Sequence, residues 1–278
     1  MSLKHLLKKK LTSKQLVHVP SSFDIIGSKD KAVAIIEIPE ELKKKRVIIA
    51  RALMEQHKNV KTVLMKNSPR KGIYRVRALQ RITGDKNTAV IHKESGCKFF
   101  LDPQNVYFSP REGAERLRLA ALVKKDENIV VFFAGIGPFA IILSKKTGAK
   151  HITGIELNPF ACRYFGKNVV LNKIENVQVI QGDVTKKVGV LAQKCDRVIM
   201  PLPEKSMDFI YEALFCLKKK GICNMYCFAA ESELAEKLQE IEKKAQTFNS
   251  EIKITGTSKV LPYGPHIWKY RIDFVKIR

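Results

Sequence analysis

The chain has 278 residues, with 51 Lys and Arg against 27 Asp and Glu, and a formal net charge of +24 at pH 7. A hydrophobic content of 45% is ordinary for a globular protein, and the length allows one large domain or two. The cationic excess favours a polyanionic partner, with nucleic acid as the first candidate. A membrane-surface protein would need an amphipathic anchor or a lipidation signal, and the sequence contains neither. A generally basic proteome is the alternative explanation of the charge.

Segments that would place the chain in or across a membrane are missing from the sequence. No apolar run approaches the ~18–20 residues that cross a bilayer, and the first residues lack the apolar core of a signal peptide. We therefore expect a cytoplasmic protein. The six cysteines form no Cys-x-x-Cys pair, so we expect buried thiols and no metal.

The N-terminal part of the chain predicts a basic accessory domain. Residues 1–20 form a lysine-rich arm, either a solvated tail or a nucleic-acid contact. Residues 21–105 predict a small α+β unit, because strand patterns cluster around a single helical pattern. The expected elements are strands at 32–38, 60–66, 74–82, 87–92 and 97–101 and a helix at 40–56. Arg75 and Arg77 share one face of a strand, as a solvated surface or as one aimed at phosphate and base.

From residue 106 onward the pattern changes to one domain of alternating strands and helices, 106–278. A helix is expected at about 110–123, where Arg111 and Glu115 have the i, i+4 spacing of an ordinary helical ion pair. Further strands are expected at 129–133, 151–155, 177–180, 196–200, 222–228, 251–255 and 270–276, and helices at 138–147, 159–172, 184–193, 205–219 and 231–247. This alternation predicts an α/β fold with a doubly wound, mostly parallel sheet.

The turn after the strand at 129–133 has the chemistry of a nucleoside site. Gly135 and Gly137 allow the backbone to approach a ligand, and Glu156 ends the next strand, where it can accept hydrogen bonds from ribose hydroxyls. A dinucleotide fingerprint fails because Ala140 stands where its third glycine would be. The alternative is a glycine-rich turn that binds no ligand.

Two further segments follow strands and so belong to the same edge of the sheet. Asp183 is placed to bond an adenine amino group, or to cap the next helix. The turn Pro201-Leu202-Pro203 is rigid because both prolines fix φ, and it is either part of the site or merely a turn.

Several motifs together resemble the archaeal and eukaryotic tRNA guanine-37 N1-methyltransferases. The resemblance covers about residues 20–278, and the order and spacing of the motifs carry it. The motifs are Ser22-Phe-Asp-Ile-Ile-Gly, Val106-Tyr-Phe-Ser-Pro-Arg with Glu115-Arg116, Phe133-Ala-Gly-Ile-Gly-Pro-Phe, Ile155-Glu-Leu-Asn-Pro, Met200-Pro-Leu-Pro and Pro262-Tyr-Gly-Pro-His266.

The resemblance implies a class I, Rossmann-like methyltransferase domain preceded by an RNA-binding domain, with S-adenosylmethionine as cofactor and the tRNA anticodon stem-loop as partner. The two-domain plan works as a monomer, which we expect. By the same resemblance Glu115 is the general base at guanine N1, Arg75 holds guanine O6, and Pro203 completes the catalytic set. The implied cofactor-binding residues are Tyr107, Arg111, Phe133, Ala134, Gly135, Gly137, Glu156, Leu157, Asn158, Asp183, Val184 and Pro201. The chemistry is consistent, since guanine N1 must lose its proton as the methyl group arrives, while an arginine at O6 stabilises the charge that builds there.

The chain departs from the family pattern at two places. The family commonly has Asn-Leu-Pro where this chain has Pro201-Leu202-Pro203. This change favours the relatives that methylate a tricyclic wyosine intermediate at tRNA position 37, some of them bifunctional. Glu115 and the remaining Leu-Pro argue against the aminocarboxypropyl-transferring branch. Longer members also carry an elbow-binding domain, and only about twenty residues precede the resemblance here. Either the protein recognises a smaller part of the tRNA, or its basic arm and accessory domain compensate.

Two functions of other classes remain as alternatives. One is a basic RNA-binding protein with an inactive methyltransferase fold, in which Glu115 and Arg75 form only structural ion pairs. The other is a methyltransferase for a free small molecule, against which the charge and the basic accessory domain argue.

Overall fold

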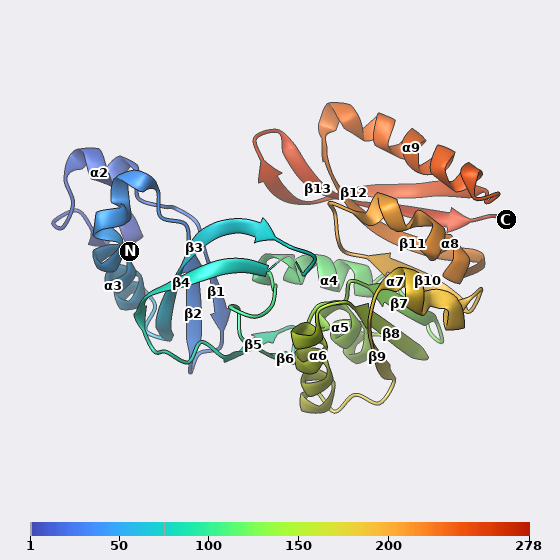
Figure 1. Ribbon diagram of the computed structural model, residues 1–278, viewed down its shortest axis with the longest axis horizontal. Coiled ribbons are helices and arrows are strands. Elements are labelled where there is room, and N and C mark those ends of the chain that lie inside the picture. The colour runs from blue at the N-terminus through green and yellow to red at the C-terminus, as the bar shows by residue number, and fades with distance from the viewer. Residues whose placement is uncertain (1, 75) are drawn as a thin grey trace. The chain divides into compact units, whose positions relative to one another are not determined.

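The computed structural model describes residues 2–74 and 76–278, which divide into two compact units on either side of the bond between Pro110 and Arg111 (Figure 1). The first unit holds a four-stranded sheet of order β1-β2-β3-β4 and a separate hairpin, β5-β6. Its elements are α1 (Leu3–Leu6), α2 (Ser13–Val17), β1 (Phe23–Gly27), β2 (Ala32–Ile36), η1 (Glu40–Lys45), α3 (Arg46–Gln56), β3 (Val60–Lys71), β4 (Val76–Gly84), β5 (Val90–Glu94) and β6 (Cys97–Leu101).

The basic N-terminal segment is packed onto its own unit. Leu3, Leu7 and Leu11 recur every fourth residue and are buried in the same apolar cluster as Leu53 of α3. The lysines between them remain exposed. The segment is therefore anchored by its leucines and is not a solvated tail, one of the two alternatives, while its exposed lysines leave the nucleic-acid contact open.

Strand β1 is an element that the sequence pattern did not predict. It pairs antiparallel with β2, with Phe23 opposite Ile36 and Gly27 opposite Ala32. Gly27 has φ of +145°, and a Cβ there would lie 2.3 Å from the carbonyl oxygen of Lys31, so the tight turn between the two strands requires glycine. Because this short strand mixes polar and apolar residues without regular alternation, its sequence does not show the two-residue period of a strand.

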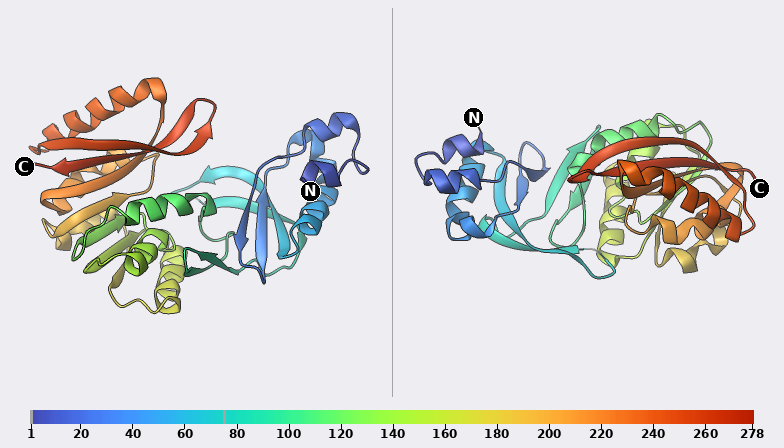
Figure 2. Two further views of the ribbon diagram at one scale, coloured as in Figure 1. Left: turned by 180° about the vertical axis from the view of Figure 1, so that it is seen from behind. Right: turned by 90° about the horizontal axis from the view of Figure 1, so that it is seen from above.

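The second unit contains a seven-stranded sheet with helices on both faces (Figure 2). Its elements are η2 (Pro110–Glu112), α4 (Gly113–Ala120), β7 (Asn128–Phe132), α5 (Pro138–Lys146), β8 (His151–Glu156), α6 (Pro159–Leu171), β9 (Val177–Gln181), α7 (Val184–Lys187), η3 (Val188–Leu191), β10 (Cys195–Met200), η4 (Ser206–Phe209), α8 (Ile210–Cys216), β11 (Leu217–Ala230), η5 (Glu231–Glu233), α9 (Leu234–Thr247), β12 (Ile252–Gly264) and β13 (Ile267–Lys276).

The sheet has the order β12-β13-β11-β10-β7-β8-β9. The five strands from β11 to β9 are parallel, whereas β13 runs antiparallel to β11 and β12 antiparallel to β13. The predicted doubly wound, mostly parallel sheet is confirmed. Since the strands from β10 to β9 are parallel, their carboxyl ends lie at one edge, and the segments that follow them meet there.

One helix is shorter than the pattern predicts and the following strand is longer. The expected helix 205–219 ends at Cys216, because Leu217 is buried and pairs with Cys195 of β10. Lys218, Lys219 and Lys220 consequently begin β11 instead of extending α8. Tertiary pairing of one apolar residue overrides the local helical propensity of the lysines.

All six cysteines are buried, which confirms the expectation of buried thiols. Within the described part of the chain, no helix is both long and apolar enough to cross a bilayer.

Candidate active site

A sharp turn follows β7 at the carboxyl edge of the sheet. Phe133, Gly135 and Gly137 all have left-handed backbones, with φ of +53°, +57° and +85°. The turn is held to β8, because Ala134 N donates to the carbonyl of Ile155 at 3.0 Å and Gly135 N donates to Glu156 Oε2 at 2.7 Å. The predicted glycine turn is thus joined directly to the predicted acidic residue.

The two glycines of this turn have different surroundings. A Cβ added to Gly137 would lie 2.1 Å from the ring of Phe165, which packs α6 against the turn and β8. A Cβ added to Gly135 would meet nothing within 4 Å. Gly137 therefore serves close packing, while Gly135 leaves open space beside the backbone, where a ligand fits.

Glu156 is the acidic group nearest to that open space. Its Oε2 accepts from Gly135 N and its Oε1 accepts from Asn158 N, each at 2.7 Å. Burial raises the pKa of Glu156, and the backbone hydrogen bonds from Asn158 and Gly135 oppose this shift. A carboxylate offers about four lone-pair positions, more than its backbone donors from Gly135, Leu157 and Asn158 occupy, so acceptor capacity remains for a hydroxyl donor of a nucleoside. The residues present fit the ribose of S-adenosylmethionine.

Other predicted cofactor-binding residues surround this turn. Asn158 caps α6 by accepting from Phe160 N at 2.9 Å, and Asp183 caps α7 by accepting from Thr185 N at 3.0 Å. Leu157 is 37% exposed, whereas Val184 is buried. The helix-cap alternative for Asp183 is therefore present in the structure, and its carboxylate keeps further acceptor positions.

The proline turn after β10 is fixed by a serine that sequence reasoning missed. Ser206 is fully buried, and its Oγ lies 2.9 Å from the carbonyl oxygen of Met200 and 2.7 Å from that of Leu202. Phe209, at the end of the same 3-10 turn, contacts Phe133 edge-on with ring centroids 4.7 Å apart. These contacts connect Pro201 and Pro203 to the glycine turn.

Glu115, on α4, is only 1% exposed and lies among polar and charged side chains of its own unit. Its Oε1 accepts from Tyr226 Oη and from Arg271 Nη1, both at 2.8 Å. Its Oε2 lies 2.9 Å from Arg118 Nη2, without the geometry of a hydrogen bond, and accepts none from the described residues. One carboxylate oxygen is thus anchored, and the other retains its lone pairs.

A buried polar chain extends from Glu115 across the sheet. Arg271 Nε donates to Asp273 Oδ1 at 2.9 Å, Asn224 Nδ2 donates to Asp273 Oδ1 at 2.6 Å, and Arg197 Nη1 donates to Asn224 Oδ1 at 2.8 Å. Although burial opposes the charged form, the bonds to Asp273 and the charge of Glu115 raise the pKa of Arg271. Alternating charges therefore hold Glu115 in one orientation.

Arg197 also holds the far end of α4. Its Nη2 donates to the carbonyl of Leu122 at 2.8 Å and to Glu127 Oε1 at 2.9 Å, and its Nε donates to Glu127 Oε2 at 2.7 Å. The helix that carries Glu115 is therefore tied to the sheet beyond its C-terminus as well as at Glu115 itself.

Tyr226 connects Glu115 to the glycine turn. Burial, followed by the adjacent charge of Glu115, raises the pKa of Tyr226 well above its usual value, so the phenol keeps its proton and donates it. Its ring lies 6.0 Å from that of Phe139, in the first turn of α5, directly after Gly137. The candidate base and the candidate cofactor turn therefore share one packed set of side chains.

The partners of Glu115 differ from the simple i, i+4 pattern. Tyr226 and Arg271 are 111 and 156 residues away from it. Sequence reasoning missed both, although Arg271 and Asp273 were visible as alternating charges in the otherwise apolar strand β13.

The remaining predicted site residues are Arg75, Tyr107 and Arg111. Arg75 lies outside the described residues. Tyr107 belongs to the first unit and is 42% exposed, whereas Arg111 is the exposed first residue of the second unit.

Comparison with known proteins identifies the family. The TRM5/TYW2 methyltransferase domain model matches residues 90–253, and the TYW2 N-terminal domain model matches residues 3–88. The chain belongs to the TRM5/TYW2 methyltransferase family. Among its curated relatives, tRNA (guanine(37)-N(1))-methyltransferase Trm5b of Pyrococcus abyssi is 40% identical over 92% of this chain and 75% of its own length.

Relatives with wyosine chemistry also match this TRM5/TYW2 chain. The tRNA 4-demethylwyosine(37)-methyltransferase Taw21 of Saccharolobus solfataricus is 37% identical, covering 73% of this chain and 76% of its own. Among solved structures, that of Methanocaldococcus jannaschii TYW2 in complex with AdoMet has a TM-score of 0.70 and 28% identity, covering 92% of this chain and all of its own.

Proposed function

We propose that this chain transfers a methyl group from S-adenosylmethionine to N1 of guanosine 37 in tRNA. Family membership and the name of the P. abyssi relative support the reaction. The observation that carries the proposal is the carboxylate of Glu115, which is buried with Oε1 anchored and Oε2 left without a hydrogen bond from the described residues.

The cofactor is proposed to bind at the carboxyl edge of the sheet. Glu156 would accept the ribose hydroxyls, Asp183 the adenine amino group, and the open side of Gly135 would admit the ligand beside the backbone. Tyr107 and Arg111 would contact the cofactor by family analogy. Bound there, S-adenosylmethionine supplies an electrophilic methyl group on a sulfonium sulfur.

Glu115 is proposed as the proton acceptor. Glu115 Oε2 would accept the N1–H proton, and the electron pair of that N–H bond would form the new bond to the methyl carbon as the carbon–sulfur bond breaks and leaves a neutral thioether. The negative charge that develops on the base as the proton leaves would be shared with O6. Tyr226 and Arg271 fix the orientation of the carboxylate through Oε1. Arg118, half exposed and 2.9 Å from Oε2, is the neighbour that must give way to guanine. Arg75 would stabilise the charge at guanine O6 by family analogy.

A second candidate is methylation of the wyosine intermediate at the same position. It is favoured by Pro201-Leu202-Pro203, since an asparagine side chain that would contact guanine is replaced by a proline. The 37% identity to Taw21 supports it further. Loss of one specific hydrogen bond would allow a larger, tricyclic base.

Identification of the product nucleoside tests both candidates. The protein is incubated with methyl-labelled S-adenosylmethionine and an unmodified tRNA transcript, or with tRNA that carries the tricyclic intermediate, and the digest is identified by mass. N1-methylguanosine from position 37 supports the first candidate, and a methylated tricycle alone supports the second. Aminocarboxypropyl transfer, or binding of tRNA without any transfer, would overturn both.

A further inference from the structure

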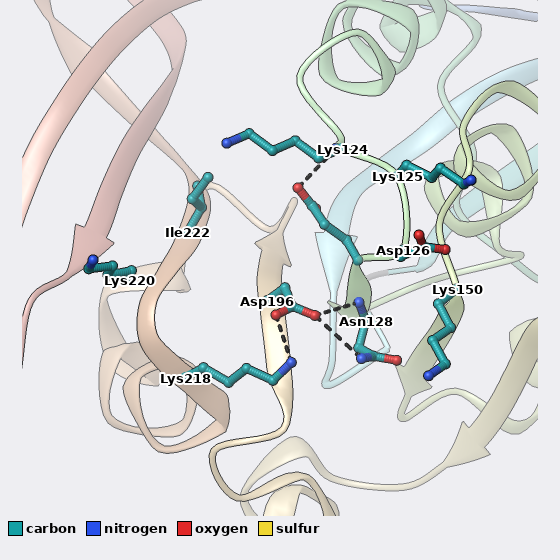
Figure 3. Close-up of a pocket in the computed structure, with 10 residues that line it drawn as sticks. Lys124, Lys125, Asp126, Asn128, Lys150, Asp196, Lys218, Lys220 and Ile222 are labelled. Atoms are coloured by element: carbon teal, nitrogen blue, oxygen red, sulfur yellow. Dashed lines mark hydrogen bonds and ion pairs between the residues drawn. The ribbon is translucent and has the colours of Figure 1, made fainter.

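A wide depression lies at the edge of the second unit opposite the candidate active site. It has a volume of about 610 Å³ and is lined by residues at the amino ends of β7 and β10, in the loops that precede β7 and β8, and at the start of β11. Lysines surround it, with Asp196 near its centre (Figure 3). Five of the ten lining residues are lysines, against three carboxylates.

Two of the three carboxylates are already neutralised within the protein. Glu127 is paired with Arg197 at 2.7 Å, and Asp196 accepts from Lys218 Nζ at 2.7 Å and from Asn128 N at 2.8 Å. The bonds from Lys218 and Asn128 outweigh desolvation and lower the pKa of Asp196, which therefore stays ionised and keeps Lys218 in place. Only Asp126 is left to balance the other lysines.

The other four lysines of the lining remain unpaired among the residues that the structure describes. Lys124, Lys125, Lys150 and Lys220 are exposed, and none makes an ion pair with any residue that the structure describes. They come from three separate segments of the chain, before β7, before β8 and in β11. Charges of one sign around a hollow, without internal partners, attract a polyanion more strongly than scattered charges do.

The chemistry of the lining selects the kind of anion. Lysine binds phosphate as a point charge, whereas base recognition uses aromatic stacking or the forked donors of arginine. None of the ten lining residues is aromatic or an arginine. We propose that this depression binds the phosphodiester backbone of RNA, without reading its sequence.

The position is compatible with one RNA that reaches both edges of the sheet. Strand β7 has five residues, and at ~3.3 Å per residue it spans about 17 Å. A folded RNA could therefore place a base at the carboxyl edge and phosphates at the amino edge. The proposed methyltransferase function supplies only the choice of RNA as the partner.

The test compares two triple variants that lose the same charge. One carries Lys124→Gln, Lys150→Gln and Lys220→Gln in the depression, and the control carries Lys243→Gln, Lys253→Gln and Lys259→Gln at exposed positions elsewhere in the same unit. Binding of a tRNA transcript and of an unrelated RNA of equal length is measured against salt concentration. Lysine contacts to phosphate release counterions, so the slope of log K against log salt should fall by about 2 in the first variant for both RNAs.

The control variant should change that slope by less than about 0.5. Equal slopes in the two variants, with both folded by circular dichroism, would overturn the proposal, whether or not methyl transfer is found. Calorimetry with inorganic pyrophosphate distinguishes a site for small anions from a site for the RNA backbone. If the first variant loses pyrophosphate binding but keeps the wild-type salt slopes for RNA, the RNA proposal is overturned.

Discussion

Arg271 Nη1 lies 2.8 Å from Glu115 Oε1, although the two residues are 156 positions apart in the chain. This pair joins the last strand of the sheet to the helix that carries the candidate base. Because Arg271 also binds Asp273, its guanidinium is fixed at two points, and Glu115 cannot rotate without breaking a buried ion pair. The pair thus couples the fold of the second unit to its proposed chemistry.

Replacing Arg271 by Gln should lower both stability and rate. Loss of one partner of a buried pair costs about 3–5 kcal/mol, and without Arg271 the carboxylate of Glu115 is no longer held in one orientation. We expect the Tm and the single-turnover rate of methyl transfer to fall while the Kd for S-adenosylmethionine stays unchanged. Arg271→Lys should restore part of both the Tm and the rate.

The matched control for Arg271 is an exposed pair of equal length. Lys259 Nζ lies 2.8 Å from Glu231 at the surface of the same unit. Lys259→Gln should leave the Tm and the rate of methyl transfer unchanged, because exposed pairs contribute little. A wild-type rate of methyl transfer in Arg271→Gln would contradict its role at Glu115.

The two glycines of the turn should respond differently to alanine. Gly135→Ala places a methyl group in open space, so it should weaken S-adenosylmethionine binding by roughly tenfold or more, with only the ~1 kcal/mol strain of a left-handed backbone. Gly137→Ala would collide with Phe165 and should lower the Tm much further. Calorimetric Kd and thermal unfolding measure both effects. Equal cofactor affinity in wild type and Gly135→Ala would contradict the ligand assignment.

Glu156 should make cofactor binding depend on pH. Burial raises its pKa, so the carboxylate becomes neutral at a higher pH than an ordinary glutamate and then loses acceptor capacity for ribose. Affinity should therefore be full above the raised pKa and fall as the pH drops through it. The effect of Glu156 on folding stability has the opposite pH dependence. Because its pKa is raised in the folded protein, this group favours the folded state at low pH, and that contribution to stability is lost as the pH rises through the raised pKa.

Titration of the cofactor between about pH 8 and pH 5 checks this prediction. In Glu156→Gln, affinity should be roughly 10–100-fold weaker and independent of pH over that range, because hydrogen bonds to the charged acceptor are gone. Parallel pH dependence in wild type and variant would rule out Glu156 as the titrating group.

Pro201→Asn should change the choice of substrate. The family commonly has asparagine there, and an added amide could donate to or accept from guanine. We expect kcat/KM for unmodified tRNA to rise relative to that for tRNA carrying the tricyclic intermediate, by roughly tenfold. Leu202→Ile serves as a control in the same turn. An unchanged ratio in Pro201→Asn would show that this position does not select the base.

The sequence predicted the parts of this protein that depend on local pattern. The parallel sheet and the link between the turn after Phe132 and Glu156 follow from strand periodicity and glycine placement. The environment of Glu115 could not be predicted, because its partners Tyr226 and Arg271 are brought to it by the strand order β10-β11-β13. Tertiary pairing likewise ended α8 at Cys216 and created the lysine-lined depression from three distant segments.

The most direct measurement is the single-turnover rate of methyl transfer to a tRNA transcript by Glu115→Gln, with cofactor Kd measured in parallel. Glutamine keeps the shape of the side chain but cannot take the N1 proton, so the rate should fall by roughly 10²–10⁴-fold while the Kd for S-adenosylmethionine stays unchanged. As a control, Glu236→Gln replaces an exposed carboxylate on α9 by a carboxamide and should retain the wild-type rate. A wild-type rate in Glu115→Gln would contradict the assignment of Glu115 as the base.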